Sequence, residues 1–527
     1  MNSKLFLSEE STFVKQSITP QILPGLLLSS DILGLFVSLG MALWLRQSEG
    51  LKITDPALYG FGLLVIIGLY LANTYHPDSQ IVGLRAPARI VISNVIVAFF
   101  ASGLIYLLGA WQQNPLLWRG TIVPCLLVFT LWSVTSRLLA TNWARSHSEQ
   151  SRWLILGGNE GAIQFCRKFI ARYPLIKLAV LTESKSERIQ PYEMTRVKDF
   201  SHLSEEIQIF SVDKRRFKSE SKLDSHSENE QSGFTKTLDP ENQRFFTPSQ
   251  NVNCLGNLND LPNLVYYPWS GVVVATHKEL TDEQVRQLMP LRLQGIPIYR
   301  LPEAYENIWF KLPSSLLEDT WFAFSAGFNL FPGGFSLKLK RIADFVFTIL
   351  LLTLLSPLML LTALAIKLDS PGSIFYSQLR TGLNGKPFKV HKFRSMSQDA
   401  EKQGAQWASK SDSRITRVGR LIRLTRIDEL PQILNVLQGQ MSLIGPRPER
   451  PEFDAKLKEE IPYYEVRYLV KPGITGWAQV MYPYGASIED AYEKLSYDLY
   501  YIKNYSLWLD IAIFFKTIRV VLLGKGR

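Results

Sequence analysis

Cysteine and histidine are scarce in this chain of 527 residues, and their scarcity excludes several kinds of site. Its three cysteines, Cys125, Cys166 and Cys254, lie far apart and lack the spacing of metal ligands. They therefore predict neither a disulfide framework nor a zinc centre. His391 is the only one of the six histidines after residue 337. A lone histidine is more often structural than catalytic, so it receives no role.

Signals for secretion and for nucleic-acid binding are also lacking. Met1–Pro20 is polar and mixed in charge, without the short apolar run and small-residue cleavage site of a signal peptide. No zinc-finger or RNP signature accompanies the net charge of +11. Together with a hydrophobic content of 46%, this charge favours a membrane protein whose partner is an anionic lipid surface. The length predicts two or three domains.

Four apolar stretches at the start of the chain each approach the roughly 20 residues that cross a bilayer. We expect a first domain over residues 1–145 with four transmembrane helices. They are placed at about Ile22–Leu45, Leu58–Thr74, Arg89–Ala110 and Thr121–Ala140. Three arginines follow the fourth stretch and only two cations lie in the first loop, which places both ends of this region in the cytoplasm. These cations are Arg137, Arg145 and Arg152 after the fourth stretch, and Arg46 and Lys52 in the loop.

Asp31 lies inside the first apolar stretch. A carboxylate at mid-membrane costs about 2.5–3.5 kcal/mol, so this residue needs an explanation. It could form a polar site that faces lipid or a partner. Alternatively, it could lie at a helix interface near one membrane face, and we favour this second interpretation.

At Trp153 the long apolar stretches give way to shorter alternating segments, which predicts an α/β module over residues 150–305. The segment WLILGGNEGAIQFCRKF is typical of a buried strand, a Gly-rich turn and a helix, and residues 271–276 and 296–299 are typical of further strands. This alternation indicates a Rossmann-like, mostly parallel sheet. The turn has only a partial dinucleotide fingerprint, GGxxG, so we favour ligand-free scaffolding or dimerisation over nucleotide binding. Its glycines are Gly157, Gly158 and Gly161.

Two segments connect this module with its surroundings. Residues 211–251 are rich in charged and polar residues and poor in aliphatic ones, which predicts a disordered insertion. Residues 306–336 form an aromatic-rich linker, which could be an interfacial belt or the packing edge of the module. The aromatic residues considered are Trp309, Trp321, Phe322 and Phe324.

A long apolar segment begins the C-terminal domain, which we place at residues 337–527. Residues 341–367 are long enough to cross a bilayer, yet both flanks are basic and Ser356-Pro357 interrupts the middle. We therefore prefer a re-entrant helical hairpin to a spanning helix with a proline kink. The last apolar segment, from Leu507, is equally consistent with an interfacial helix and with a buried core helix.

The densest pattern of charge lies between residues 414 and 449. Five arginines recur at every third position, namely Arg414, Arg417, Arg420, Arg423 and Arg426. On a helix this stripe drifts by about 60° per step and makes a broad basic face. Asp428 and Glu429 follow it and would point about 100° apart on a helix, so one could act as a nucleophile while the other holds a metal or a proton. We expect the arginines to lower the pKa of both carboxyl groups.

Carboxylates beside many cations suggest phosphoryl transfer with Mg²⁺. The spacing alone is equally consistent with a solvated amphipathic helix whose acidic pair only binds arginines. Longer motifs favour the first alternative, because they resemble the bacterial sugar transferase family, the polyprenyl-phosphate sugar-1-phosphate transferases. These motifs are KFRSM at 392–396, RIDELPQILNVLQGQMSLIGPRPE at 426–449, KPGITGWAQV at 471–480 and YDLYYIKNYSLWLDI at 497–511.

The resemblance implies a fold and a location. The N-terminal layout is similar to that of the long members, which transfer galactose 1-phosphate or glucose 1-phosphate to undecaprenyl phosphate. We accordingly expect a multidomain protein of the bacterial inner membrane with a mainly α catalytic domain, and a homodimer. Nucleotide sugars are made in the cytoplasm, so the middle and catalytic domains should face it. A fifth full crossing would leave Asp428 on the wrong side, which again favours a re-entrant hairpin.

The resemblance also implies roles for individual residues. Asp428 would attack the sugar-linked phosphorus of a UDP-sugar, releasing UMP, and undecaprenyl phosphate would then take the sugar phosphate from this aspartate. Glu429 would orient Asp428 or share Mg²⁺ with it, and the adjacent Glu449 would orient Arg447. Phosphate contacts are expected from Lys392, Arg394, Arg426 and Arg447. Contacts to the donor nucleotide are expected from Arg467, Lys471, Thr475 and Trp477.

Two other functions remain as alternatives. The chain could be a non-catalytic membrane scaffold of a complex that assembles exopolysaccharide or O-antigen, or a nucleotide sensor that uses the Gly157–Gly161 turn. The intact acidic pair, the Pro-Arg-Pro turn and the KFRSM segment favour the transferase. The sequence does not distinguish between the two sugars.

Overall fold

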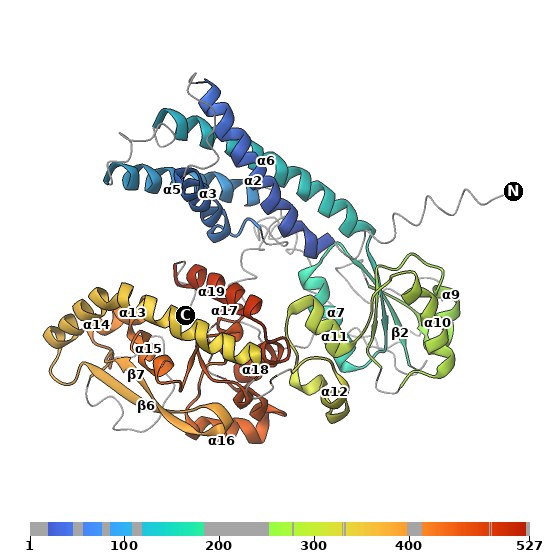
Figure 1. Ribbon diagram of the computed structural model, residues 1–527. Coiled ribbons are helices and arrows are strands. Elements are labelled where there is room, and N and C mark those ends of the chain that lie inside the picture. The colour runs from blue at the N-terminus through green and yellow to red at the C-terminus, as the bar shows by residue number, and fades with distance from the viewer. Residues whose placement is uncertain are drawn as a thin grey trace, which may run out of the picture. The chain divides into compact units, whose positions relative to one another are not determined.

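The computed structural model describes two compact units, Met1–Arg300 and Leu301–Arg527 (Figure 1). Within them, the residues described are 19–45, 56–75, 85–107, 119–183, 252–276, 279–328, 330, 334–397, 414–483, 485 and 487–522. The predicted insertion at residues 211–251 therefore lies outside the described residues.

Four helices lie at the predicted positions of the apolar stretches. They are α2 (Thr19–Leu45), α3 (Pro56–Leu71), α5 (Arg85–Leu107) and α6 (Arg119–Gln150). Their buried faces share one apolar core, which includes Leu39, Val65, Ile90 and Phe129. By length and composition α2 and α6 can cross a membrane, whereas α3 and α5 contain shorter apolar helical stretches. Four crossings therefore stay a prediction.

Asp31 lies at the interface between α2 and α6, as we favoured from the sequence. Arg137 donates from Nη1 to Oδ1 and from Nη2 to Oδ2 of Asp31, both at 2.5 Å. Ser133 Oγ donates to Oδ1 at 3.0 Å, and the Tyr75 hydroxyl donates to Oδ2 at 2.7 Å. Both charged side chains are fully buried. Counting Arg137 among the free cations after the fourth helix was therefore wrong, because Asp31 neutralises it inside the bundle.

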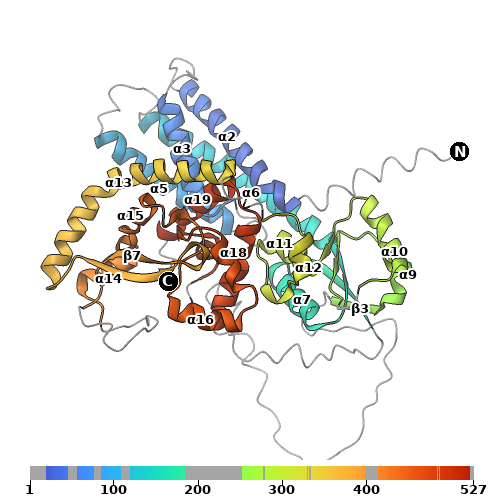
Figure 2. The same cartoon turned by 60° about the horizontal axis from the view of Figure 1, so that its bottom comes forward.

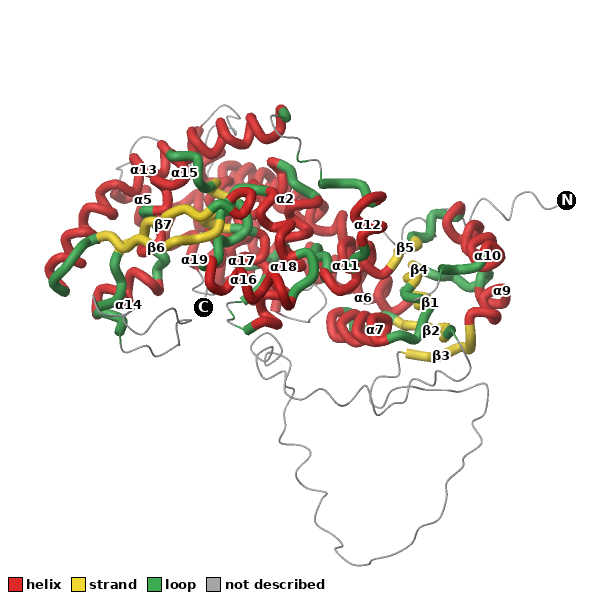
Figure 3. Tube along the Cα trace, turned by 90° about the horizontal axis from the view of Figure 1, so that it is seen from below, coloured by secondary structure: helices red, strands yellow, loops and turns green. Residues whose placement is uncertain are grey.

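The middle module contains a parallel five-stranded sheet. Its strands are β1 (Arg152–Leu156), β2 (Lys177–Thr182), β3 (Val252–Asn257), β4 (Gly271–Val274) and β5 (Ile298–Arg300). They pair in the order β3-β2-β1-β4-β5 (Figure 3), which is the order of a doubly wound sheet. The predictions found β1, β4 and β5 and missed β2 and β3.

The turn after β1 is occupied by the chain's own groups. Gly157 has φ +126°, and a Cβ there would lie 2.4 Å from the carbonyl oxygen of Ala275, so this position requires glycine. Asn159 caps helix α7 (Glu160–Arg172) by accepting from the Ala162 amide at 2.8 Å. Its amide nitrogen donates to the Ala275 carbonyl at 2.5 Å. Contacts within the chain thus account for Gly157 and Asn159, and nucleotide binding by this turn stays a prediction.

The C-terminal unit is mainly helical, with two small pairs of strands. The helices are α11 (Leu301–Trp309), α12 (Asp319–Phe324), α13 (Phe335–Asp369), α14 (Arg417–Leu424), α15 (Gln432–Leu437), α16 (Pro451–Glu460), α17 (Trp477–Met481), α18 (Ile488–Lys503) and α19 (Leu507–Leu522). The antiparallel pair is β6 (Phe375–Thr381) with β7 (Pro387–Phe393), and the parallel pair is β8 (Ser442–Ile444) with β9 (Gly473–Thr475). In the aromatic segment, Trp321 and Phe322 pack against the core beside Tyr464 and Leu499, whereas Phe324 is exposed.

Helix α13 continues through Ser356 and Pro357, and Figure 2 shows it bent between its two halves. Proline lacks the amide that would bind the carbonyl of Thr353, four residues earlier. The Ser356 hydroxyl replaces it and donates to this carbonyl at 2.9 Å. Most large apolar side chains of α13 are exposed, including Leu354 and Leu360. The helix is long enough to cross a bilayer, and the re-entrant path stays a prediction.

The C-terminal helix α19 has one buried face and one exposed face. Ile513 and Asp510 are buried in the unit, and Asp510 accepts from Lys340 of α13 at 2.7 Å. Trp508 and Ile511 on the same helix are exposed. One face of α19 therefore packs against the core, as the core-helix alternative predicted, and an interfacial role of the other face stays a prediction.

Candidate active site

The two candidate catalytic carboxylates lie on a short turn that follows α14. Arg426 has φ +59°, a left-handed conformation that separates α14 from the 3₁₀ turn η7 (Ile427–Glu429). The expected single helical stripe of five arginines was therefore wrong. Only Arg417, Arg420 and Arg423 lie on α14. Because the backbone reverses at Arg426, Asp428 and Glu429 belong to a separate turn.

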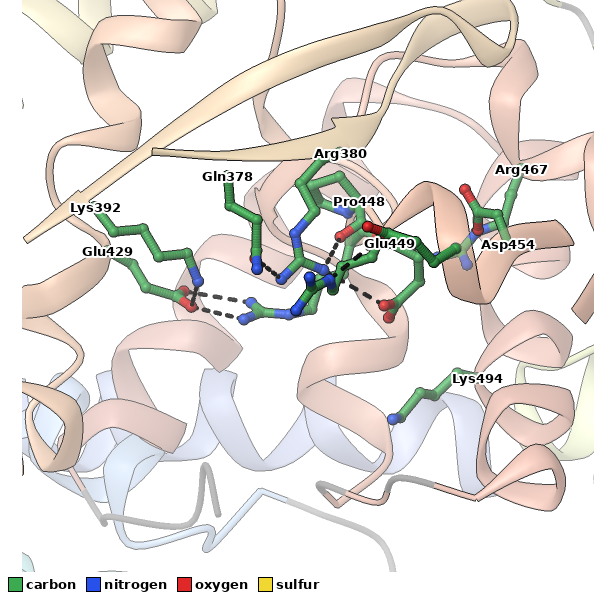
Figure 4. A network of polar contacts seen from close by, with 12 residues as sticks. Gln378, Arg380, Lys392, Glu429, Pro448, Glu449, Asp454, Arg467 and Lys494 are labelled. Atoms are coloured by element: carbon green, nitrogen blue, oxygen red, sulfur yellow. Dashed lines mark hydrogen bonds and ion pairs between the residues drawn. The ribbon is translucent and has the colours of Figure 1, made fainter. Parts of the chain in front are cut away.

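Glu429 is buried and binds two cations (Figure 4). Lys392 Nζ on β7 donates to Oε1 at 3.1 Å. Arg447 donates from Nη2 to Oε1 at 2.6 Å and from Nη1 to Oε2 at 3.3 Å. Burial would raise the pKa of Glu429, but Arg447 and Lys392 outweigh it and hold the pKa well below its ordinary value. Glu429 is therefore an ionised anchor for two cations.

Asp428 has a different environment although it is the next residue. Its Oδ1 is buried and has no hydrogen-bond partner among the described residues. Burial and the charge of Glu429 raise the pKa of Asp428, although Lys392 and Arg426 oppose the shift. The expected lowering of both pKa values was thus wrong for Asp428. Arg426 and Arg423 do lower its pKa, but burial and the charge of Glu429 outweigh them. The turn therefore carries a strongly acidic carboxyl group beside a more basic one.

The backbone of Arg447 is fixed by a hydrogen bond from Arg467. It stands between Pro446 and Pro448 after β8, and its carbonyl accepts from Arg467 Nη2 at 2.7 Å. Arg467 is buried, and the same nitrogen also contacts Asp498 Oδ2 on α18 at 3.2 Å. These contacts fix the Pro-Arg-Pro turn and leave the Arg447 side chain on Glu429. The structure thus shows Arg467 supporting this turn, and its predicted nucleotide contact stays untested.

Two cations near this turn were not among the predicted site residues. Arg380 on β6 donates to the Pro448 carbonyl at 3.2 Å and to Gln378 Oε1 at 2.6 Å, and it pairs with Glu449 at 3.5 Å. Glu449 thus binds Arg380 in the structure, where we expected it to orient Arg447. Lys494 on α18 is the second cation: burial lowers its pKa, Glu449 opposes this, and Arg447 adds to it. Gln378 and Arg380 lie two positions apart on one strand, and this alternation could have predicted that both face the site. Nothing in the sequence distinguished Lys494.

Arg394 does not contact Glu429, the carboxylate that Lys392 binds, although only Phe393 separates Arg394 from Lys392 in the sequence. Its terminal nitrogens donate to the carbonyls of Ile366, Ser370 and Pro371 at the end of α13. The Arg394 side chain is buried. The geometry therefore gives Arg394 a helix-capping role and does not support the predicted phosphate contact.

The three remaining predicted residues have contacts elsewhere in the unit. Trp477 is buried and donates from Nε1 to the Phe310 carbonyl at 2.9 Å. The hydroxyl groups of Thr475 and Thr517 lie 2.8 Å apart, which joins β9 to α19. Burial and the charge of Arg341 lower the pKa of Lys471. Trp477 and Thr475 thus have packing roles that the motif did not reveal, and nucleotide contacts of all three stay predictions.

The predicted Mg²⁺ can be tested against the oxygen ligands of the site. Among the described residues no group of three or more acidic, histidine or cysteine side chains could hold a metal ion. Mg²⁺, however, is usually bound by one or two carboxylates together with substrate phosphates. The unpartnered Oδ1 of Asp428 suits such a shared site, whereas both oxygens of Glu429 already bind cations. The donor set therefore fits an ion that the substrate helps to hold.

Comparison with known proteins identifies relatives of the C-terminal unit. A family model described as bacterial sugar transferase matches residues 335–524. The chain is 42% identical over 283 residues to the UDP-N-acetylgalactosamine-undecaprenyl-phosphate N-acetylgalactosaminephosphotransferase of Aeromonas hydrophila, covering 53% of this chain and 66% of the relative. It is 43% identical over 187 residues to the UDP-glucose:undecaprenyl-phosphate glucose-1-phosphate transferase of Escherichia coli K12, covering 35% and 40%.

A third relative is matched over more of its own length. The chain is 44% identical over 181 residues to the UDP-glucose:undecaprenyl-phosphate glucose-1-phosphate transferase of Caulobacter vibrioides, covering 34% of this chain and 68% of the relative. By contrast, the match spans less than two thirds of the Aeromonas and Escherichia relatives. The residues matched by the family model, 335–524, include the acidic pair.

Proposed function

This chain belongs to the bacterial sugar transferase family, and from that membership we propose that it transfers a sugar 1-phosphate from a UDP-sugar to undecaprenyl phosphate. Two of its relatives are named for this reaction with N-acetylgalactosamine and with glucose. The exposed apolar helices support a site of action at the bacterial inner membrane, with the catalytic unit on the cytoplasmic side, where nucleotide sugars are made.

The observation that carries the proposal is the unequal environment of two adjacent carboxyl groups. Glu429 is saturated by Lys392 and Arg447, whereas Asp428 keeps a buried oxygen without a partner and has a raised pKa. Environments that push two pKa values apart assign different roles to the two groups. Glu429 positions cations that can bind phosphate oxygens, and Asp428 is the nucleophile.

In the first step, an oxygen of Asp428 attacks the sugar-linked phosphorus of the donor. The bond from this phosphorus to the bridging oxygen breaks, and UMP leaves with that oxygen. Arg447 and Lys392 stabilise the negative charge of the phosphates, and their positions are set before the donor binds. The bidentate guanidinium of Arg447 is suited to this task because its turn is already fixed by Arg467.

In the second step, a phosphate oxygen of undecaprenyl phosphate attacks the same phosphorus, and the bond to Asp428 breaks. One pyrophosphate linkage is consumed and one is formed, so the reaction needs no ATP. A bound Mg²⁺, held by Asp428 together with substrate phosphates, would supply further charge neutralisation. The basic residues of α14 would hold the unit near anionic headgroups, each contributing about 1 kcal/mol.

The experiment that tests this function is a panel of UDP-sugars incubated with the full chain, Mg²⁺ and undecaprenyl phosphate in lipid nanodiscs. UDP-glucose, UDP-galactose and UDP-N-acetylgalactosamine belong in the panel, and UMP is the product to measure. We expect UMP release with at least one donor, together with a lipid-linked sugar pyrophosphate. A chain that retains its fold and releases no UMP with any donor would favour the scaffold alternative.

A further inference from the structure

Arg394 follows β7 directly and closes the C-terminal end of α13. Its Nη2 donates to the carbonyls of Ile366 and Ser370 at 3.3 and 2.6 Å and to the Ser370 hydroxyl at 2.9 Å. Its Nη1 donates to the Pro371 carbonyl at 3.0 Å. The Ile366 carbonyl also accepts from the Ser370 amide at 3.3 Å, whereas the Ser370 and Pro371 carbonyls lie beyond the helix and have no intrahelical donor. A cation also suits the negative end of the helix dipole. Arg394 therefore joins α13 to the strand that carries Lys392.

The same junction also fixes the start of α14. Asp369, the last residue of α13, accepts from the Val418 amide at 3.2 Å through its carboxylate. A Cβ at Gly419 would lie 2.0 Å from the carbonyl oxygen of Ser395, so α14 approaches the chain beside Arg394 very closely. The end of α13, the end of β7 and the first turn of α14 therefore meet at one place.

An apolar cluster extends this junction to the two carboxylates. Its buried members are Ile366 of α13, Phe393 of β7 and Ile422 of α14. Ile427 and Leu430 pack against the cluster, and these two residues flank Asp428 and Glu429 in the sequence. A shift at the end of α13 would therefore be transmitted through packed side chains to the catalytic turn.

We propose that Arg394 is a positioning residue that fixes α13 relative to Asp428, so that a lipid phosphate at the bilayer surface reaches the carboxylate. This inference rests on the proposed function, in which Asp428 receives and then releases a sugar phosphate. Helix α13 presents a long exposed apolar face, so its seating in the bilayer sets the depth of the junction. A soluble donor reaches Asp428 from water, and its binding does not depend on that depth.

The test separates the two steps of the reaction in Arg394→Lys and Arg394→Gln, with the full chain in nanodiscs. The donor step is measured without lipid acceptor, as release of UMP and as formation of the adduct in which Asp428 carries the sugar phosphate. The lipid step is measured as transfer from the preformed adduct, with the KM for undecaprenyl phosphate. We expect the donor step to stay within about threefold and the lipid step to fall by at least about tenfold, since small misplacements cost this much.

Comparison of the two substitutions separates the contribution of the charge from that of the planar guanidinium group. Lysine keeps the charge but cannot bind three carbonyls from fixed directions, so it should recover only part of the lipid step. A larger loss in the donor step would overturn the proposal, because Arg394 would then act as a donor phosphate ligand. Equal losses in both steps, or no loss in either, would overturn it as well.

Lys367 provides a matched control on the same turn. Its Nζ donates to the Gly372 carbonyl at 3.2 Å, so Lys367→Gln removes a nearby cation and leaves the contacts of Arg394 intact. We expect both steps to stay unchanged in this variant. A loss of the lipid step equal to that of Arg394→Gln would mean that surface charge near the lipid explains the effect, which contradicts the proposal.

Hydrogen exchange gives a readout that does not depend on the reaction. Without any substrate, Arg394→Lys should exchange faster than the wild type in residues 366–374 and also in residues 427–430. Unchanged exchange in 427–430 would contradict the coupling even if the chain proved to catalyse another reaction. If the Arg394 variants fail to fold, Ser370→Ala removes one of the four hydrogen bonds and should slow the lipid step by about two- to threefold.

Discussion

Two of the buried networks of acid and cation, one in each unit, differ in how completely the acid is bound. In the N-terminal bundle, both oxygens of Asp31 receive Arg137, and Ser133 and Tyr75 add further hydrogen bonds. In the C-terminal unit, Glu429 is bound in this way, but the adjacent Asp428 keeps a buried oxygen without a described partner. The carboxylate of Asp31 is thus fully bound, although Arg137 Nε has no described partner, whereas Asp428 keeps an oxygen that a substrate can meet.

The largest expected effect on the rate comes from an Asp→Asn substitution in the second network, and the same substitution in the first network is its control. Asp428→Asn removes the nucleophile with almost no change in shape, so UMP release should fall on the order of 10³-fold or more. Asp31→Asn makes the same chemical change in the satisfied network and should keep the rate per folded molecule. Rates of UMP release, normalised to the folded fraction, measure both. An Asp428→Asn enzyme with more than about a tenth of the wild-type rate would refute the assignment of the nucleophile.

The free energy of unfolding should depend more on the Asp31–Arg137 pair than on Asp428. Arg137→Met leaves Asp31 buried without its cation, which costs about 3–5 kcal/mol. Replacing both residues, as in Asp31→Leu with Arg137→Met, should recover much of this loss because no buried charge remains. Thermal unfolding of the full chain in one detergent compares the variants. If Arg137→Met unfolded at the wild-type temperature, the ion pair would not be holding α2 and α6 together.

Glu429→Gln tests whether the saturated carboxylate controls its neighbour. The maximal rate should fall by about 10- to 100-fold, because Lys392 and Arg447 lose the charge that positions them. At the same time, removal of a negative neighbour should lower the raised pKa of Asp428. Asp428 attacks in its ionised form, so the acidic limb of the rate profile should move to lower pH. A limb that stays in place or moves upward would contradict the coupling.

Lys392→Gln should move the same limb in the opposite direction. Lys392 lowers the pKa of Asp428, so its removal should raise this pKa and make the enzyme lose activity at a higher pH than the wild type. We expect a smaller loss of maximal rate than for Glu429→Gln, about three- to tenfold, because Arg447 still binds Glu429. The rate of UMP release between pH 4 and pH 9 gives both values. Parallel shifts in the two variants would show that general stability, and not Asp428, sets the limb.

The sequence predicted these two networks to different degrees. The helical positions of Asp31 and the motif around Asp428 and Glu429 were clear from pattern and resemblance. The pairing of Asp31 with Arg137 was not, because 106 positions separate them and helix packing decides which residues meet. The expected pKa of Asp428 was wrong for a related reason. Charge in the sequence does not show that Asp428 is buried, and burial is the largest cause of its raised pKa.

The motif residues illustrate the same limit within one short segment. Lys392 and Arg394 both belong to KFRSM, yet Lys392 contacts Glu429 while Arg394 closes α13. Trp477 and Thr475 also lie in a long motif and have packing roles in the structure. Resemblance identified which segments matter, and only the folded chain shows which side chains of those segments reach the site.

Intact-mass and peptide mass spectrometry of the full chain, incubated with donor and Mg²⁺ but without lipid acceptor, tests the central claim most directly. The account predicts a mass increase equal to one sugar phosphate, located on the peptide that contains Asp428, and its loss when undecaprenyl phosphate is added. Release of lipid-linked product from an enzyme that never carries this adduct, or an adduct on another residue, would contradict it.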